Sequence, residues 1–124
     1  MGLDMYLEKR KKGSRSYDDY EEVAYWRKAN QIRNWFDRKI GVENCEYHTV
    51  TRELLVELVQ DCNRVLDNHA LARRVMPTSE GFFFGCTEYS EWYFEDLERT
   101  VEMVLGVIAE TDWETEEVAY FEWW

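Results

Sequence analysis

The sequence contains little proline, histidine and cysteine, and it lacks any long run of apolar residues. Its three cysteines are an odd number and lie far apart, which excludes a disulfide framework. No apolar run approaches the roughly 20 residues that a membrane-spanning helix needs. Aromatic residues nevertheless make up 16% of the 124 residues, a content that disordered chains do not have. We therefore expect one folded domain, residues 1–124, in the cytoplasm.

Motifs of metal binding and catalysis are also scarce. Cys45 and His48 form one close cysteine–histidine pair, whereas a structural zinc site usually needs two such pairs. Cys62 falls in an apolar helical stripe, which predicts a buried and unreactive thiol. The chain has no Walker loop, no G-x-S-x-G motif and no H-E-x-x-H motif. We therefore predict no metal site, no cofactor and no catalytic residues, and nothing in the sequence supports an enzymatic activity.

Positive charge is scarce too, above all in the second part of the chain. There are 26 acidic and 15 basic residues, which gives a formal net charge of −11. Residues 88–124 contain 12 acidic residues and one basic residue, Arg99. Because nucleic-acid binding needs a cationic face, we predict no direct binding to nucleic acid. The charge favours attraction to a basic protein surface instead.

Hydrophobic periodicity predicts an α+β fold. Alternation of apolar and polar residues predicts strands near both ends of the chain, and these two strands are expected to pair in antiparallel fashion. Apolar residues at helical spacing predict three main helices, which pack on a small, mostly antiparallel sheet formed with the N- and C-terminal strands. The predicted helices span residues 21–39, 51–66 and 90–109, and the predicted strands span residues 3–7, 46–50 and 118–123.

The stretch YWRKANQIRNWF, residues 25–36, interleaves aromatic and basic residues. Such a stretch suits either a nucleic-acid surface or an amphipathic helix. Its apolar residues recur at intervals of three and four, which favours a helix with one face on the core. Asn30 and Asn34 are poor helix formers on a merely solvated face. We therefore predict that they line a pocket or a partner contact. The apolar stripe consists of Tyr25, Ala29, Ile32, Phe36 and Ile40.

Gly81 and Gly85 bracket three phenylalanines in the segment GFFFG. This segment is interpreted either as a hydrophobic plug or as the wall of a pocket. The helix that follows carries four glutamates at spacings of four, three and four, which predicts an acidic ridge opposite its apolar face. A row of carboxylates can imitate the phosphates of DNA and bind a cationic channel. The ridge, our predicted partner-binding surface, consists of Glu91, Glu95, Glu98 and Glu102.

Three blocks of the chain, MGLDMYL, YWRKANQI with NWF, and PTSEGFFFGCTEYSEWYFEDLERTVE, resemble a family of small uncharacterised proteins of bacteriophages and prophages. An insert that is long in that family is short here, at residues 8–22. The resemblance implies a setting in an infected host cell and implies no mechanism. It also singles out a set of shared positions, namely Asp4, Arg27, Asn30, Gly81, Gly85, Tyr93 and Asp96.

Two hypotheses about function follow. In the first, the protein is a non-enzymatic inhibitor of a host defence nuclease, either an anti-CRISPR protein or an inhibitor of a restriction enzyme, and its acidic ridge binds the nuclease. In the second, it binds or converts a small ligand in a pocket near Arg27, Asn30 and the GFFFG segment. An exposed row of carboxylates favours the first hypothesis, and a deep pocket containing Arg27 and Asn30 favours the second. The predicted pocket residues are Asp4, Arg27, Asn30, Asn34, Gly81, Gly85, Tyr93 and Asp96.

Overall fold

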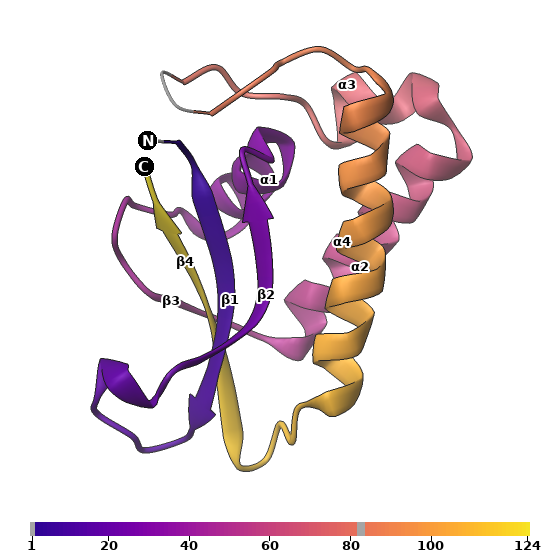
Figure 1. Ribbon diagram of the computed structural model, residues 1–124. Coiled ribbons are helices and arrows are strands. Elements are labelled where there is room, and N and C mark those ends of the chain that lie inside the picture. The colour runs from indigo at the N-terminus through magenta and orange to yellow at the C-terminus, as the bar shows by residue number, and fades with distance from the viewer. Residues whose placement is uncertain (1, 82–83) are drawn as a thin grey trace.

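The computed structural model describes residues 2–81 and 84–124, and its fold is the predicted α+β class (Figure 1). The described residues form a four-stranded antiparallel sheet and four α-helices. In chain order they are β1 (Asp4–Lys11), β2 (Glu21–Arg27), α1 (Asn30–Ile40), β3 (His48–Val50), α2 (Arg52–Asp67), α3 (Ala72–Val75), α4 (Glu91–Glu110) and β4 (Glu116–Trp123). No helix in these ranges is both long enough and apolar enough to cross a membrane.

The two terminal strands lie in the middle of the sheet. The strand order is β2-β1-β4-β3, and β1 pairs with β2 on one side and with β4 on the other. In the β1–β4 register Asp4 lies opposite Trp123 and Leu7 lies opposite Tyr120. The predicted antiparallel pairing of the two ends of the chain is therefore confirmed, and the ends lie side by side in Figure 1.

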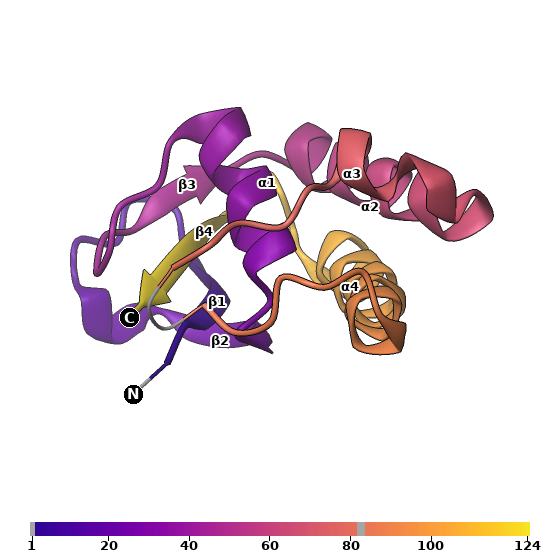
Figure 2. The same cartoon turned by 90° about the horizontal axis from the view of Figure 1, so that it is seen from above.

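The long helices α1, α2 and α4 cover one face of this sheet (Figure 2). Successive strand residues point to opposite faces, and the residues toward the helices are fully buried, among them Leu7 and Trp26. The ring of Phe36 on α1 stacks on that of Tyr120 on β4, with 4.3 Å between centroids. The indole of Trp26 donates a hydrogen bond to the Thr100 hydroxyl on α4, at 2.8 Å. The core therefore lies between the sheet and the three helices.

The predicted helix over residues 21–39 is wrong over nearly its first half. Residues Glu21–Arg27 form the edge strand β2, and the helix begins only at Asn30. Within β2 the buried residues Ala24 and Trp26 alternate with exposed ones, as on a half-buried strand. The four-residue spacing from Tyr25 to Ala29 matched a helix by coincidence, because those residues belong to different elements. Pairing with β1 decides the conformation of this segment.

Local signals mark the end of α1 and the beginning of α2. The Thr51 hydroxyl accepts a hydrogen bond from the Leu54 amide at 3.0 Å and caps α2. Gly41 follows α1 with a φ of 66°, a conformation that favours glycine. Cys62 is fully buried on α2, and burial raises the pKa of its thiol to about 12. At neutral pH this thiol is therefore protonated and unreactive, as predicted.

A buried ion pair fastens β4 to α1. Glu122 is fully buried, and its carboxylate accepts hydrogen bonds from Arg33 Nε at 3.1 Å and Nη2 at 3.1 Å. The Tyr120 hydroxyl and the Trp124 indole also donate to it, at 2.8 and 2.7 Å. Because a buried charge is costly unless it is paired and hydrogen-bonded, these donors keep the last strand in place.

The two faces of α4 differ sharply in burial, and a matched pair of leucines tests this. Leu97→Ala should lower the free energy of unfolding by about 2–5 kcal/mol, because Leu97 is fully buried in the core. Leu105→Ala on the same helix should change it by about 0.5 kcal/mol or less, because Leu105 is 49% exposed. Urea unfolding measures both. Equal losses in the two variants would show that the core face of α4 is misassigned.

Candidate functional site

An open cavity of about 380 Å³ lies beside the N-terminal half of α4. One wall is the junction of β2 and α1, a second is the loop that precedes α4, and the third is α4 itself. The lining residues are Arg27, Lys28, Gln31, Gly85, Cys86, Glu88, Ser90, Trp92, Tyr93, Glu95, Asp96 and Arg99. Four predicted pocket residues, Arg27, Gly85, Tyr93 and Asp96, therefore come together, although they lie far apart in the sequence.

Asn30 lies behind the cavity wall. Its side chain is fully buried, and its amide nitrogen donates to the carbonyl oxygens of Phe84 at 3.1 Å and Cys86 at 2.8 Å. Its amide oxygen accepts from the backbone N–H of Ser79 at 2.9 Å. Every one of these partners belongs to the connection between α3 and α4. Asn30 is therefore the anchor of that loop, and it does not line the cavity.

Asn34 and Tyr93 fasten the beginning of the same connection. The Asn34 amide donates to the carbonyl oxygen of Pro77 at 3.0 Å. The Tyr93 hydroxyl donates to the carbonyl oxygen of Met76 at 2.6 Å, and burial raises the pKa of this phenol. Tyr93 is therefore a neutral donor that also forms part of the cavity floor, whereas Asn34 does not reach the cavity.

Two glycines of the predicted pocket make room for close contacts. Gly85 has a φ of 89°, and a Cβ there would lie 2.9 Å from Cβ of Lys28. Lys28 itself has a φ of 56°, which is uncommon for a lysine. At Gly81 a Cβ would meet the ring of Phe84, which is buried. Phe82 and Phe83 lie outside the described residues, so the plug-or-wall interpretation of GFFFG stays open for them.

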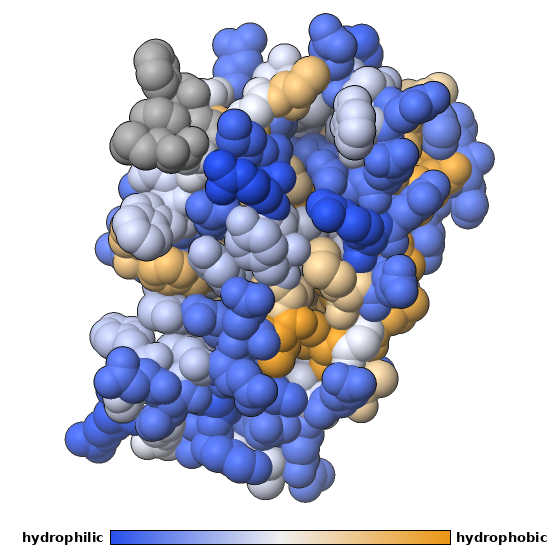
Figure 3. Space-filling model, viewed as in Figure 1, coloured by the Kyte–Doolittle hydropathy of each residue, from blue (hydrophilic) through white to orange (hydrophobic). Residues whose placement is uncertain are grey.

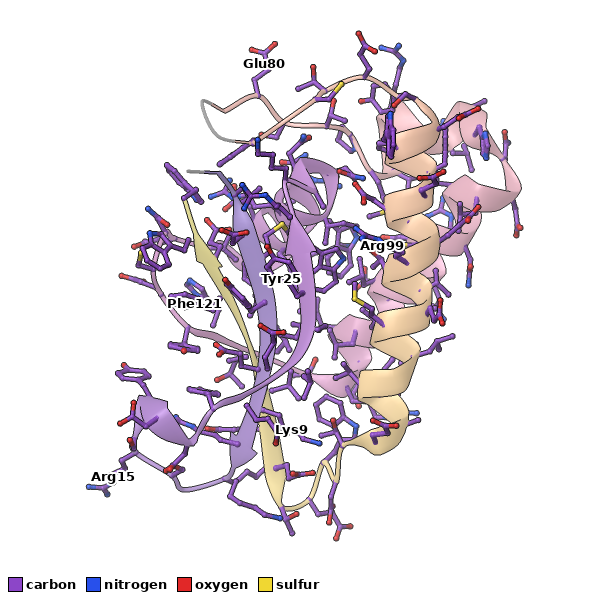
Figure 4. All side chains as sticks on the ribbon, in the orientation of Figure 1. Lys9, Arg15, Tyr25, Glu80, Arg99 and Phe121 are labelled. Carbon is purple, nitrogen blue, oxygen red and sulfur yellow. The ribbon has the colours of Figure 1, made fainter. Side chains whose placement is uncertain are left out.

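Three of the six charged residues that line the cavity, Arg27, Asp96 and Arg99, form ion pairs among the described residues. Arg99 Nη2 donates to Asp96 Oδ1 at 2.8 Å on the same helix, and Figure 4 labels Arg99 on α4. Burial raises the pKa of Asp96, and the nearby Arg99 opposes this shift. Gln31 is almost fully buried, and its amide donates to the Tyr93 carbonyl oxygen at 3.3 Å. The cavity therefore offers mixed charge with no single dominant sign.

Asp4 pairs with Arg27 from outside the cavity. Arg27 Nη1 donates to Asp4 Oδ1 at 2.9 Å, and the Tyr25 hydroxyl donates to the same oxygen. Asp4 lines a smaller hollow next to Trp123 and Trp124. The cavity thus gathers half of the predicted pocket residues, while the other four, Asp4, Asn30, Asn34 and Gly81, have structural contacts elsewhere.

The four glutamates of the acidic ridge are all exposed on α4. They lie opposite the buried residues Leu97, Thr100 and Val104 of the same helix. Within residues 2–81 and 84–124 none of the four takes part in an ion pair. Figure 3 shows hydrophilic residues over most of this face and a group of apolar residues beside the lower half of α4. Because Glu95 also lines the cavity, the ridge and the cavity are contiguous.

Some residues of this region were missed at the level of the sequence. Trp92 is 75% exposed, and Lys28, Gln31 and Cys86 also line the cavity. Trp92, Asp96 and Arg99 follow one another at spacings of four and three, so helical periodicity does indicate their shared position. Lys28 and Gln31 carry no such signal, because the tertiary fold brings them to α4.

The Cys45–His48 pair does not form half of a metal site in the fold. Cys45 is exposed, and His48 Nε2 accepts a hydrogen bond from the Glu43 amide at 3.2 Å. Across the described ranges no three side chains of histidine, cysteine, aspartate or glutamate are grouped so that they could hold a metal ion.

Comparisons with known proteins give no assignment. The chain matches no protein-family model, no curated protein and no solved structure. The resemblance to phage proteins stays a prediction, and the function has to be argued from the geometry.

The buried position of Asn30 leads to a stability prediction. Asn30→Ala should lower the free energy of unfolding by about 2–3 kcal/mol, because it leaves buried backbone groups without hydrogen-bond partners. Asn34→Ala is the matched control and should cost about 1 kcal/mol, since one hydrogen bond is lost. The readouts are urea midpoints and amide hydrogen exchange of residues 78–86. An Asn30→Ala variant as stable as the wild type would refute the role of Asn30 as the anchor of the loop.

The raised pKa of Asp96 leads to a prediction about pH. The folded state binds the Asp96 proton more tightly than the unfolded chain, so its charge destabilises the fold as the pH rises above the ordinary value of 3.8. The stability of the wild type relative to Asp96→Asn should therefore fall between acidic and neutral pH. Asp112 is the control, because hydrogen bonds from Thr115 and Glu114 lower its pKa. Relative to Asp112→Asn, the wild type should gain stability over the same range. If both stability differences change with pH in the same way, the assigned pKa shifts of Asp96 and Asp112 are contradicted.

Proposed function

We propose that this protein is a non-enzymatic interaction protein whose acidic ridge binds a cationic surface of another protein. The observation that carries the proposal is the exposed row of Glu91, Glu95, Glu98 and Glu102, which has no cationic partner within the described residues. Solvation alone does not require such a row, because neutral or mixed side chains keep a helix hydrated equally well.

The spacing of the row suits a repeating positive surface. Neighbouring side chains at three or four residues have Cβ atoms roughly 5–6 Å apart, and like charges at this spacing destabilise a helix by about 0.2–0.5 kcal/mol per pair. From Glu91 to Glu102 the row extends about 16 Å at 1.5 Å per residue. A cationic partner would relieve this repulsion. The row has the character of a short line of phosphates, which a DNA-binding channel accepts.

The helix that carries the row is held rigidly. Leu97 and Val104 are fully buried in the core, and Thr100 accepts the hydrogen bond of Trp26 on β2. The carboxylates are therefore presented on a fixed axis, and binding does not require the helix to be ordered first. Such pre-organisation lowers the free-energy cost of association.

The partner we propose is a nuclease of host defence, of the CRISPR or restriction type. Such enzymes contain a cationic channel for DNA, and a net charge of −11 attracts the protein to it. The resemblance to phage proteins supports this setting. Attraction of this kind accelerates association and weakens with salt.

The cavity supports the ligand-binding hypothesis less well. Its volume of about 380 Å³ lies within the usual range for a small-ligand site. Both of its arginines already have partners, however, since Arg99 pairs with Asp96 and Arg27 pairs with Asp4, and the charges left over are of both signs. Asn30, which was expected to contact a ligand, is occupied by the backbone of the loop. The ridge therefore remains the better-supported site.

The test is a reversal of charge on the ridge. Glu95→Lys with Glu98→Lys should slow association with the cationic partner by at least tenfold at low salt and should leave the fold intact, because both positions are exposed. Stopped-flow association rates with a partner captured from bacterial lysate, measured at low and high ionic strength, provide the readout.

The matched control is Glu110→Lys with Glu114→Lys, which changes the net charge equally at exposed positions outside the ridge. This control should slow association much less than the ridge reversal. Equal slowing in both variants would mean that only the total charge matters, and rates insensitive to salt and to both reversals would refute the proposal.

A further inference from the structure

The face of the sheet that the helices leave open carries a continuous row of aromatic rings. On β1 and β4 the residues next to the buried Leu7 and Tyr120 point away from the helices, and they include Tyr6 and Phe121. Figure 4 labels Tyr25 on β2 and Phe121 on β4, on either side of β1. We call this row the tyrosine face; it consists of Tyr6, Tyr17, Tyr20, Tyr25, Tyr47 and Phe121.

The rings of the tyrosine face touch one another from end to end. Tyr25 and Tyr6 have centroids 5.2 Å apart, and Tyr6 lies 6.2 Å from Phe121. Phe121 lies 4.6 Å from Tyr47, which stacks on Tyr20 at 4.3 Å. Tyr17 continues the stack on Tyr47 at 5.1 Å and is 68% exposed. None of these rings is needed to fill the core on the helix side.

An arginine of the chain already occupies one ring of this face. The guanidinium carbon of Arg10 lies 4.2 Å from the centre of the Tyr20 ring. Arg10 Nε also donates to the Glu117 carboxylate at 2.7 Å. A guanidinium here therefore combines a stacking contact with a charge-assisted hydrogen bond, an arrangement that a lysine ammonium reproduces less well.

Carboxylates on the same face are left without a cation. Glu8 on β1 lies directly opposite Glu22 on β2, and like charges in that position repel each other. Within the part of the chain that the structure describes, neither glutamate forms an ion pair. After burial, Asp4 and Tyr25, both glutamates also contribute to raising the pKa of the Tyr6 phenol. The tyrosine face thus combines ring surfaces with uncompensated negative charge.

We propose that the tyrosine face is a second binding surface, for an arginine-bearing segment of a partner protein. The segment would place guanidinium groups on the exposed rings of Tyr17 and Tyr25, as Arg10 does on Tyr20, and would neutralise Glu8 and Glu22. Aromatic rows on sheets also stack on single-stranded nucleic acid, but that requires a uniformly cationic surround, whereas Asp4, Glu8 and Glu22 lie on this face beside its arginines. A second copy of the chain would bring together two negatively charged faces.

This inference shares one premise with the proposed function, the cationic character of the partner, and it concerns a different surface and a different chemistry. The acidic ridge has no aromatic row, so it should bind arginine through charge and carboxylate hydrogen bonds, without stacking. The tyrosine face should prefer arginine, because the planar guanidinium stacks on aromatic rings. Arginine and lysine peptides of equal length and charge, compared on variants of each surface, therefore show which surface binds them.

The experiment measures fluorescence anisotropy of short labelled homopeptides of arginine and lysine, equal in length and charge, with the full-length protein. The wild type should bind the arginine peptide more tightly, by roughly two- to five-fold for each ring engaged. Tyr17→Leu with Tyr47→Leu should remove most of this preference while retaining the weaker, charge-driven binding. Tyr17→Leu alone, at the most exposed ring, tests the same loss if the double variant unfolds.

Two controls assign the effect to a surface. Trp92→Leu removes a ring that is even more exposed than Tyr17 and lies away from the tyrosine face, and this variant should keep the arginine preference. Glu95→Lys with Glu98→Lys should weaken the binding of both peptides alike and leave the arginine preference unchanged. Failure of the proposed ridge function can therefore be distinguished from failure of the proposed tyrosine-face function.

Several results would overturn the inference. One is equal affinity of the wild type for the two peptides, and another is an unchanged arginine preference in folded tyrosine variants. If the wild type binds a labelled single-stranded DNA and the tyrosine variants do not, the face is assigned to nucleic acid instead. A dimer in analytical ultracentrifugation that dissociates on Tyr17→Leu would assign it to self-association.

Discussion

The pairing of β1 with β4 in the middle of the sheet is the constraint on which the rest of the structure depends. It joins residues at opposite ends of the chain, from Asp4 opposite Trp123 to Lys11 opposite Glu116. One set of alternating residues forms the base of the core, and the other set contributes Tyr6 and Phe121 to the tyrosine face. The same register places Glu122 beneath Arg33, so the last strand is fixed to α1 as well as to β1.

The fold separates two surfaces that both suit a cationic partner. The acidic ridge runs along the solvent side of α4, whereas the tyrosine face lies on the side of the sheet that the helices leave open. The ridge offers charge alone, and the tyrosine face adds stacking. Between the β2–α1 junction and α4 lies the cavity, whose arginines are both paired and whose lining carries charges of both signs. Binding to a protein explains this distribution better than binding to a small molecule does.

Local patterns made much of this architecture predictable from the sequence. The terminal strands, the cap at Thr51 and the helix that carries the ridge follow from alternation, side-chain capping and helical spacing. The strand β2 did not, because its pairing with β1 outweighs a spacing that also fits a helix. The role of Asn30 depends on backbone groups about 50 residues away, which no local pattern reveals. The tyrosine face was missed because its rings come from several separate segments.

The most direct test is whether DNA competes with this chain for the cationic surface of a captured partner. Proteins captured from bacterial lysate on the immobilised wild-type chain would be challenged with a short DNA duplex and, separately, with a neutral polymer. The account predicts that the duplex releases a captured protein, that the neutral polymer does not, and that the Glu95→Lys with Glu98→Lys variant fails to capture it. A captured protein that stays bound in excess duplex, and that the reversed variant captures equally well, would contradict the central role of the acidic ridge.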